Sequence, residues 1–422
     1  MGIYVLHTSD THLGYRQYGI VERENDVYDV FGEIIDIALR EHVDLVVHSG
    51  DFFDSIRPPP QAILIAIRHL RRLREKGIPF ITILGDHDTP KRRVLPPLVL
   101  LEELGYVRLV GVGEQRLAYT VKTRSGEVFV AGISNKRKTS SSVLKLMLKK
   151  LSNPPSSIPS ILLLHQCIRG MCIDYELELG DIPIGYTYYA LGHVHTYKEF
   201  EIGDGVAVYP GSPEVMRVDE FRAQSERYIV LTELGKGVAY RQKIRLQRVR
   251  PQYELVIDDI ESMELKVKQF IADIVSRGRA SKKPFVYVRV VGGEYNRSKI
   301  LNVLERFLRR VVLDYRVYIE KKSDDIGITV EGIEHVAKPL DKLELLEKLL
   351  GDKSLAELAD TLIAILSSGS ESEALRESLK IVLERYDIDI EFTPTSIARA
   401  STKRSSTRGS LDLLLRQQSR MR

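Results

Sequence analysis

Cysteine is scarce in this sequence, with only Cys167 and Cys172 among 422 residues. Two cysteines cannot complete a four-ligand zinc site or build the disulfide framework of a small secreted domain. We therefore expect both to be reduced, small packing residues in a cytoplasmic protein. No stretch is long and apolar enough to span a bilayer. A strand is expected to begin at Ile3, which leaves no room for a secretory signal, so no membrane contact is expected.

An excess of charge of either sign is also missing. Lysine and arginine number 62, aspartate and glutamate 58, and the formal net charge is +4. This balance shows no overall preference for nucleic acid, so any such preference must come from local patches. The chain is 43% hydrophobic and 28% charged, as in globular proteins. Because 422 residues exceed one ordinary core, two or three domains are expected.

The stretch from Asp44 to Asp51 places an acidic residue at the end of a short apolar strand. Leu45 to Val47 predicts a buried strand, and Gly50 permits a sharp turn. Asp51 then stands at the carboxyl edge of the strand, where ligand sites gather in α/β proteins. A single Gly-Asp pair after a strand is more often an ordinary turn. Here the order of strand, turn and Asp or His occurs five times, which chance does not readily produce.

The five expected strand ends share side chains that bind divalent metals. Carboxylate oxygen suits manganese, and imidazole adds affinity for transition metals. Two metal ions about 3.5–4 Å apart can hold the attacking and leaving oxygens of a phosphoryl transfer, provided that one carboxylate bridges them. The residues that fit such a site are Asp10, His12, Asp51, Asp86, His165, His193 and His195.

His87 lies directly after one of these ligands without a metal assigned to it. A free imidazole in that place suits protonation of a leaving oxygen. Five of the ten histidines stand at strand ends, whereas His7 and His48 lie within strands and are interpreted as structural. A core position remains the alternative for any single histidine of the five.

Helices alternate with strands as far as about residue 245, which predicts an α/β fold. Apolar spacing predicts helices over 25–42, 60–76, 95–104 and 141–152, with further strands at 107–112, 128–133, 206–209 and 228–232. From Pro251 a strand-helix-strand-helix-strand order runs to residue 319. A leucine-rich helical stretch follows over 338–386. The residues from 393 onward are rich in Ser, Thr and Arg and predict a disordered tail.

The motifs resemble a known signature. Asp10-Thr11-His12, Gly50-Asp51, Gly85-Asp86-His87-Asp88, His165 and Gly192-His193-Val194-His195 are similar to the calcineurin-like metallophosphoesterase signature. Their continuations resemble the archaeal form of one branch, the DNA double-strand-break repair nucleases of the meiotic-recombination-eleven (SbcD-like) family. These continuations are Leu13-Gly14-Tyr15, Gln166, Ala190-Leu191 and Tyr209-Pro210-Gly211-Ser212. The resemblance covers residues 10 to 212, about half of the chain.

The resemblance implies a two-sheet αββα sandwich over 1–245 and a small α/β DNA-binding cap over 251–335. It also implies a helical segment over 338–386 and a basic tail over 393–422. The implied activity is manganese-dependent cleavage of DNA at broken ends, as exonuclease and endonuclease, with magnesium the less effective ion. One manganese ion would be held by Asp10, His12, Asp51 and His195, and the other by Asp51, Asp86, His165 and His193. His87 would assist the leaving 3′ oxygen.

Two positions depart from the family pattern. The usual Gly-Asn-His-Asp reads Gly85-Asp86-His87-Asp88, which changes the charge at the second metal. Many members also have a histidine where this chain has Asp54. Two alternatives therefore stay open: a calcineurin-like enzyme that acts on a nucleotide or phosphoprotein, and a DNA-end-binding scaffold with a silent nuclease.

Basic and aromatic residues follow the metal motifs. Such residues could neutralise phosphates and stack on frayed bases, although an ordinary solvated surface is the alternative. The candidate DNA contacts are Tyr15, Arg16, Arg57, Lys91, Arg92 and Arg93.

The two remaining partner predictions come from an excess of apolar residues on helices. Helices 60–76 and 95–104 carry more than one face needs, and the resemblance implies a homodimer through Ile63, Ile67 and Leu100. Burial within one subunit also accounts for them. The resemblance further implies that 338–386 binds the coiled-coil root of an SbcC-like, SMC-type ATPase, and the alternative is a helical appendage of the nuclease itself. The implied location is the cytoplasm, at the nucleoid.

Overall fold

The structure is a computed structural model that describes residues 2–90, 95–112, 116–136, 141–151, 153–172, 174–235, 239–276, 282–291, 297–320, 346–347, 351–368 and 381. Contacts divide the chain into two compact units, Met1–Glu331 and Gly332–Arg422. Among the described residues, no helix combines the length and apolarity that crossing a membrane requires.

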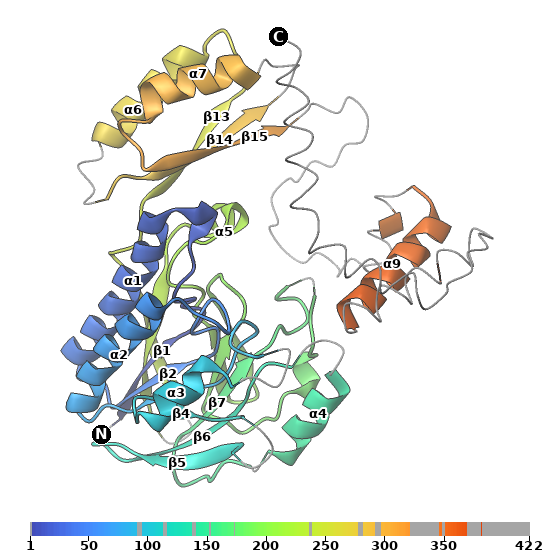
Figure 1. Ribbon diagram of the computed structural model, residues 1–422. Coiled ribbons are helices and arrows are strands. Elements are labelled where there is room, and N and C mark those ends of the chain that lie inside the picture. The colour runs from blue at the N-terminus through green and yellow to red at the C-terminus, as the bar shows by residue number, and fades with distance from the viewer. Residues whose placement is uncertain are drawn as a thin grey trace, which may run out of the picture. The chain divides into compact units, whose positions relative to one another are not determined.

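The first sheet of the larger unit has six strands in the order β12-β11-β1-β2-β3-β4. Its parallel strands are β1 (Ile3–Thr8), β2 (Leu45–His48), β3 (Phe80–Thr82) and β4 (Arg108–Leu109). β11 (Tyr228–Leu234) runs antiparallel to β1, and β12 (Ala239–Arg245) runs antiparallel to β11 at the edge of the sheet. The outer face carries α1 (Val21–Arg40), α2 (Pro60–Glu75) and α3 (Pro97–Glu103), packed around Phe31, Val46 and Leu101 (Figure 1).

The second sheet also has six strands, in the order β5-β6-β7-β8-β10-β9. The parallel strands are β6 (Glu127–Ile133), β7 (Ser160–His165), β8 (Tyr188–Gly192) and β10 (Gly205–Tyr209). At the two edges run the antiparallel strands β5 (Ala118–Lys122) and β9 (Lys198–Ile202). The outer core, around Ala131 and Leu162, includes Leu144 and Leu148 of α4 (Ser141–Lys150).

The two sheets pack face to face. Val5 and Val47 of the first sheet share one buried cluster with Leu163 and Ala190 of the second. Because the central strands are buried on both faces, they read as nearly continuous apolar runs. The prediction of an α/β fold with two stacked sheets between layers of helices is confirmed.

A three-stranded parallel sheet follows as the cap. Its strands are β13 (Gln252–Ile257), β14 (Phe285–Val291) and β15 (Asp314–Glu320). The helices α6 (Met263–Ser276) and α7 (Arg297–Leu308) pack on it through Val267, Ile300 and Leu304. A six-residue helix, α5 (Val218–Ala223), precedes β11, and single 3-10 turns lie at Gln17–Gly19 and Leu179–Asp181.

Ion pairs connect α1 to the start of the cap. Asp26 is 1% exposed, and its carboxylate lies 2.7 Å from Arg23, 2.9 Å from Arg250 and 2.9 Å from Lys282. Such a carboxylate, removed from water, is stable only with this number of cationic partners. The network therefore fixes where the chain leaves the first sheet for the cap.

Parts of the sequence prediction lie outside the described residues. The smaller unit contains α9 (Lys353–Ser368), which falls in the stretch predicted to be helical. The tail over 393–422 is not among the described residues. The domain boundaries at 245, 251, 335 and 338 stay predictions.

The expectation of two reduced cysteines is wrong. Cys167 and Cys172 form a disulfide with 6.2 Å between their Cα atoms, a usual separation for such a bond. The loop after β7 folds back on itself at Gly170, and an isolated β-bridge pairs the backbones of Arg169 and Cys172. This turn brings together two residues that composition alone assigned to packing.

Candidate metal centre

The seven predicted ligands converge from both sheets. Asp10 and His12 follow β1, Asp51 follows β2, Asp86 follows β3, His165 ends β7, and His193 and His195 follow β8. Their ligand atoms form three overlapping groups: Asp10 with His12 and His195, Asp10 with Asp51 and His165, and Asp86 with His165 and His193. Within each group the atoms lie within 4.8 Å of one another. The structure thus brings all seven residues into one centre.

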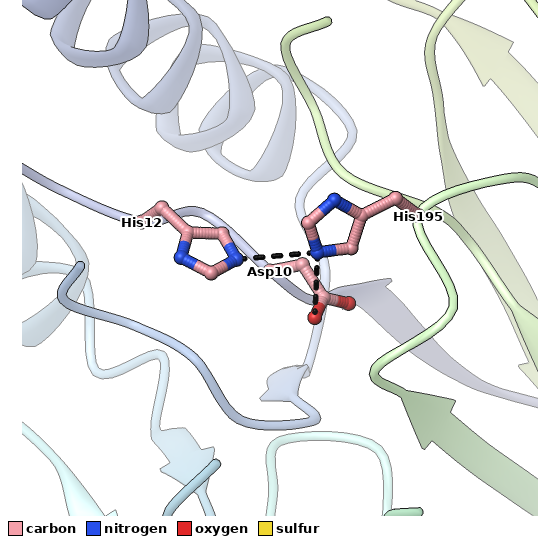
Figure 2. Close-up of side chains that lie close together, drawn as sticks. All are labelled: Asp10, His12 and His195. Carbon is pink, nitrogen blue, oxygen red and sulfur yellow. Dashed lines mark hydrogen bonds and ion pairs between the residues drawn. The ribbon is translucent and has the colours of Figure 1, made fainter. Parts of the chain in front are cut away.

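The first group is shown in Figure 2. The Nε2 atoms of His12 and His195 lie 3.3 Å apart, and Nε2 of His195 lies 3.7 Å from Oδ1 of Asp10. On the far side of the His195 ring, Nδ1 donates to the Glu220 carboxylate at 2.7 Å. The neutral ring therefore presents the lone pair of Nε2 to His12 and Asp10, which suits a cation placed among them.

His165 belongs to both of the other groups and is fully buried. Its Nδ1 donates to the carbonyl oxygen of Ser49 at 2.7 Å, so Nε2 bears the lone pair in the neutral ring. This Nε2 has no hydrogen-bond partner and lies 3.3 Å from Oδ2 of Asp51. On the more open side, Nδ1 of His193 lies 3.8 Å from Oδ2 of Asp86. A buried lone pair that faces a carboxylate lacks only a cation, so these residues fit a divalent metal.

Asp51 lies between His12 of the first group and His165 of the other two. Its Oδ2 is 3.7 Å from Nε2 of His12 and 3.3 Å from Nε2 of His165. Burial disfavours a charged ring, but Asp51 outweighs burial and raises the pKa of His165 to about 10. Burial likewise acts to raise the pKa of Asp51, and positive charge on His165 instead holds it well below its ordinary value. Both shifts express the demand of this pocket for positive charge.

The loops that carry the ligands are strained. Asp10, His12, Asp51 and His193 have φ values of 52°, 44°, 54° and 90°, in the left-handed region that L-residues seldom occupy. Such conformations cost about 1–3 kcal/mol each and persist where the surroundings enforce them, typically at functional sites. Four of the seven candidate ligands share this feature.

Backbone hydrogen bonds between the first two loops enforce that geometry. The N–H groups of Asp10 and His12 donate to the carbonyl oxygens of Gly50 and Asp51, each at 3.0 Å. Gly50 has a φ of +93°, and a β-carbon there would collide with the ring of His165. The glycine therefore serves two purposes, the turn and the close approach of a ligand from the other sheet.

Asp88 has a structural role that the sequence did not reveal. Its carboxylate accepts the N–H groups of Phe52, Phe53 and Gly85 at 2.9, 3.0 and 3.2 Å, and so joins the loops after β2 and β3. Burial, together with the charge of Asp51, raises the pKa of Asp88 to about 6. The residue belongs to a recognised motif, but its backbone partners are set only by the folded loops.

His87 lies at the edge of the centre, where its side chain is 46% exposed. Its Nδ1 donates to the carbonyl oxygen of Asp54 at 2.6 Å, and its ring centroid is 4.7 Å from that of His12. The carboxylate of Asp54 lies 3.4 Å from Nδ1 of His12. Asp54, which departs from the histidine found in many members of the resembling family, therefore contacts both histidines.

The residues predicted to contact DNA differ in exposure and in their partners within the chain. Tyr15 is half-buried, and its hydroxyl donates to the carbonyl oxygen of Met216 at 3.3 Å. Arg16 pairs with Glu24 at 2.5 Å, whereas Arg57 is exposed. The other three candidates, Lys91, Arg92 and Arg93, lie outside the described residues.

The residues predicted to form the dimer also differ in exposure. Ile63 and Ile67 are half-buried and pack against the subunit's own core. Leu100 is 49% exposed, and the same two helices and their flanks expose Leu64, Leu95 and Leu104.

Residues 3–197 match the family model of the calcineurin-like phosphoesterases. Together with the αββα fold and the clustered aspartates and histidines, this match defines the protein as a phosphoesterase of the metal-dependent class.

Three archaeal relatives, each named DNA double-strand break repair protein Mre11, identify the family within this class. The chain is 34% identical to the one from Saccharolobus solfataricus, over 90% of this chain and 98% of the relative. The Sulfolobus acidocaldarius protein is 36% identical, over 78% and 85% of the two chains. The Thermoplasma acidophilum protein is 30% identical, over 85% and 93%. The chain belongs to the Mre11 family.

Proposed function

We propose that this protein is a manganese-dependent DNA nuclease that cleaves phosphodiester bonds at double-strand breaks. The observation that supports it most is the place of Asp51, whose Oδ2 faces Nε2 of His12 at 3.7 Å and Nε2 of His165 at 3.3 Å. A carboxylate between two ligand sets is what a phosphodiesterase centre with two metal ions requires. The family relatives, which are named as DNA double-strand break repair proteins, support DNA as the substrate.

In this proposal the two ligand sets share Asp51. Asp10, His12 and His195 complete the first set, and Asp86, His165 and His193 complete the second. Two bound divalent ions would neutralise phosphate charge and make a water molecule a better nucleophile. The mixed set of carboxylate and imidazole ligands favours manganese, because carboxylate suits hard ions and imidazole suits transition metals.

The proposed general acid is His87. Its Nδ1–H is held by the carbonyl oxygen of Asp54, which turns Nε2 away from that contact and leaves it available to a substrate. Its side chain is 46% exposed, unlike the buried His165, so a DNA strand can reach it. In the proposed reaction water attacks phosphorus, the bond to the 3′ oxygen breaks, and His87 gives a proton to that oxygen.

A cleavage assay tests the proposal directly. End-labelled duplex DNA is incubated with the protein and manganese, magnesium or a chelator, and with the Asp51→Asn variant as control. We expect cleavage with manganese, slower cleavage with magnesium, and none with chelator or with the variant. Turnover of a small phosphodiester but not of DNA would favour an enzyme acting on a nucleotide or phosphoprotein. DNA binding without cleavage would favour the silent scaffold.

We further propose that residues 338–386 bind an SbcC-like ATPase. This stretch contains α9, an apolar helix that belongs to the second compact unit, Gly332–Arg422. Leu355 of α9 is 40% exposed. A chain truncated after Lys338 should remain a folded nuclease and lose binding to the ATPase in a pull-down. Precipitation of the truncated chain would assign these helices to the enzyme's own core.

A further inference from the structure

The short helix α5 lies against the candidate metal centre with one residue and against the cap sheet with the next two. We propose that α5 couples the position of the cap to metal affinity, with Glu220 acting as the positioning residue for His195. This inference rests on the proposed function, because it takes His195 to be a metal ligand. It adds a means of regulation, since a ligand or partner that moves the cap would change how firmly the metal is held.

Glu220 fixes the ring of His195. Its Oε1 lies 2.7 Å from Nδ1 of His195, and its Oε2 accepts the N–H of Met216 at 3.0 Å. Glu220 is only 5% exposed, so water does not compete for these bonds. Because the carboxylate accepts, Nδ1 carries the hydrogen, and Nε2 keeps its lone pair toward Asp10. Partners of this kind set both the tautomer and the orientation of metal-binding histidines.

The backbone around His195 is anchored from the same region. The carbonyl oxygen of His195 accepts hydrogen bonds from Arg227 at 2.6 Å and from the N–H of Ser212 at 3.1 Å. The side chain of Gln224, directly after α5, accepts the N–H of Tyr197 at 2.7 Å. The loop that carries His195 is therefore held by residues that precede and follow α5, in addition to Glu220.

The two residues after Glu220 contact the cap. Arg222 donates two hydrogen bonds, of 2.9 and 2.6 Å, to Oε1 of Glu254 on β13. The ring of Phe221 lies 5.4 Å from that of Tyr287 on β14, at an interplanar angle of 36°. One helical turn thus joins a metal-site histidine to two neighbouring strands of the cap sheet.

Because α5 is short, its position depends on its contacts with the metal centre and with the cap. It has six residues and no side-chain hydrogen bond at its N-cap, so tertiary contacts alone determine its position. A shift of β13 and β14 must either break the contacts of Phe221 and Arg222 or move Glu220 with them. Once Glu220 moves, the ring of His195 is free to rotate and to change tautomer. Loss of such a partner typically weakens metal binding about 10- to 100-fold.

Manganese titration calorimetry on the full-length chain tests the link. Glu220→Gln, which keeps the size of the side chain, should weaken one manganese ion about 10- to 100-fold. Arg222→Ala removes a contact with the cap and none with His195, and should weaken the same ion about 2- to 30-fold. The control is Asp219→Asn, on the same helix in an exposed pair with Arg217, which should keep the wild-type affinity. Phe221→Leu gives a second test of the cap side.

A spectroscopic measurement separates positioning from general structural damage. In the metal-free protein, ¹⁵N NMR of the His195 ring should show Nδ1–H in the wild type and in Asp219→Asn. Glu220→Gln and Arg222→Ala should show a mixture of tautomers. Wild-type tautomer and affinity in Arg222→Ala and Phe221→Leu would overturn the coupling, and the same result in Glu220→Gln would overturn the positioning role. Failure of the proposed function is distinguishable, because His195→Ala would then retain both manganese ions.

Discussion

Asp51 and His165 face each other from different sheets, with 3.3 Å between Oδ2 and Nε2. Asp51 follows β2 of the first sheet, and His165 ends β7 of the second. Their meeting is therefore a property of the sheet packing, and it places a carboxylate and an imidazole lone pair together in a buried setting. Such a pair needs a proton or a metal ion between its members, and the site holds two further ligand groups beside it.

The proposed general acid can be tested by replacing His87 with asparagine. Removing a general acid typically lowers the rate about 10²- to 10⁴-fold. We expect His87→Asn to lose cleavage to that extent and to bind manganese and DNA nearly as the wild type does. Single-turnover cleavage and calorimetry measure the two properties. Loss of a manganese ion in the variant would show that His87 is a ligand and not the acid.

The proposed homodimer predicts that charge on α2 and α3 yields a folded monomer. Leu64 and Leu100 are each 49% exposed, so Leu64→Asp with Leu100→Asp should leave the subunit core intact. At an interface each new charge would be buried, at a cost of several kcal/mol. Sedimentation velocity reports the result. The control is Leu146→Asp on α4, where Leu146 is 57% exposed, and that variant should stay dimeric. A dimeric double variant would place the interface elsewhere.

The close approach of the two sheets predicts that Gly192 tolerates no side chain. A β-carbon there would collide with the backbone carbonyl of Ser49, which holds Nδ1 of His165. We expect Gly192→Ala to destabilise the protein by about 1–3 kcal/mol, as overpacking does. Gly180→Ala is the control, because nothing lies within 4 Å of its β-carbon position. Equal urea midpoints for the two variants would contradict this account.

The buried His7 predicts a loss of stability in acid. Its ring bonds Tyr188 and Ser49 at 2.9 Å each, and burial lowers the pKa of His7 to about 3. Below pH 6.5, the pKa of His7 in the unfolded chain, the unfolded chain binds a proton at this ring and the folded chain does not. The free energy of unfolding is therefore unaffected by His7 titration above pH 6.5. It decreases as the pH falls from 6.5 toward 3, by up to about 1.4 kcal/mol per pH unit.

Urea unfolding with chelator at pH 7.5 and 5.5 measures this effect. Between these pH values the wild type should lose about 1.4 kcal/mol more than His7→Gln, whatever the stability of the variant at the higher pH. An equal loss in both proteins would show that His7 accepts its proton in the folded state.

The sequence predicted the central strands well but missed three of the edge strands. Segments such as Leu45–His48 and Ser160–His165 are buried on both faces, and their apolar runs are unambiguous. The strands β5, β9 and β12, at three sheet edges, were not expected. Ala239–Arg245 shows the reason: most of its side chains are exposed, and the polar sequence that keeps an edge strand soluble also hides its periodicity.

The same distinction applies to the site. Each candidate ligand stands next to an apolar strand, so its place at the sheet edge could be predicted from chain order alone. Glu220 lies 25 residues after His195 on a single helical turn, and only the folded chain brings them together. The disulfide between Cys167 and Cys172 likewise depends on how the loop turns at Gly170. Pairings set by tertiary structure leave no periodic signal in the sequence.

Asp86 leads to the last prediction, because asparagine is the usual residue in the motif that this chain resembles. With Asp10 and Asp51, it gives the centre three carboxylates instead of two. The additional negative charge should bind the second metal more tightly and make that ion a weaker Lewis acid. It should also oppose the approach of an anionic phosphate. Nδ1 of His193 lies 3.8 Å from Asp86, so the carboxylate is in place to take part in the site.

The Asp86→Asn variant separates these effects, since the two side chains are nearly isosteric and the ligand oxygen is kept. We expect weaker binding of the second manganese ion by calorimetry, together with equal or faster single-turnover cleavage of duplex DNA. Asp174→Asn, an exposed aspartate in the loop after β7, is the matched control and should change neither quantity. If the wild type binds one metal ion and cuts nothing while Asp86→Asn cuts DNA, the protein is a DNA-end-binding scaffold whose nuclease is silenced by a single carboxylate.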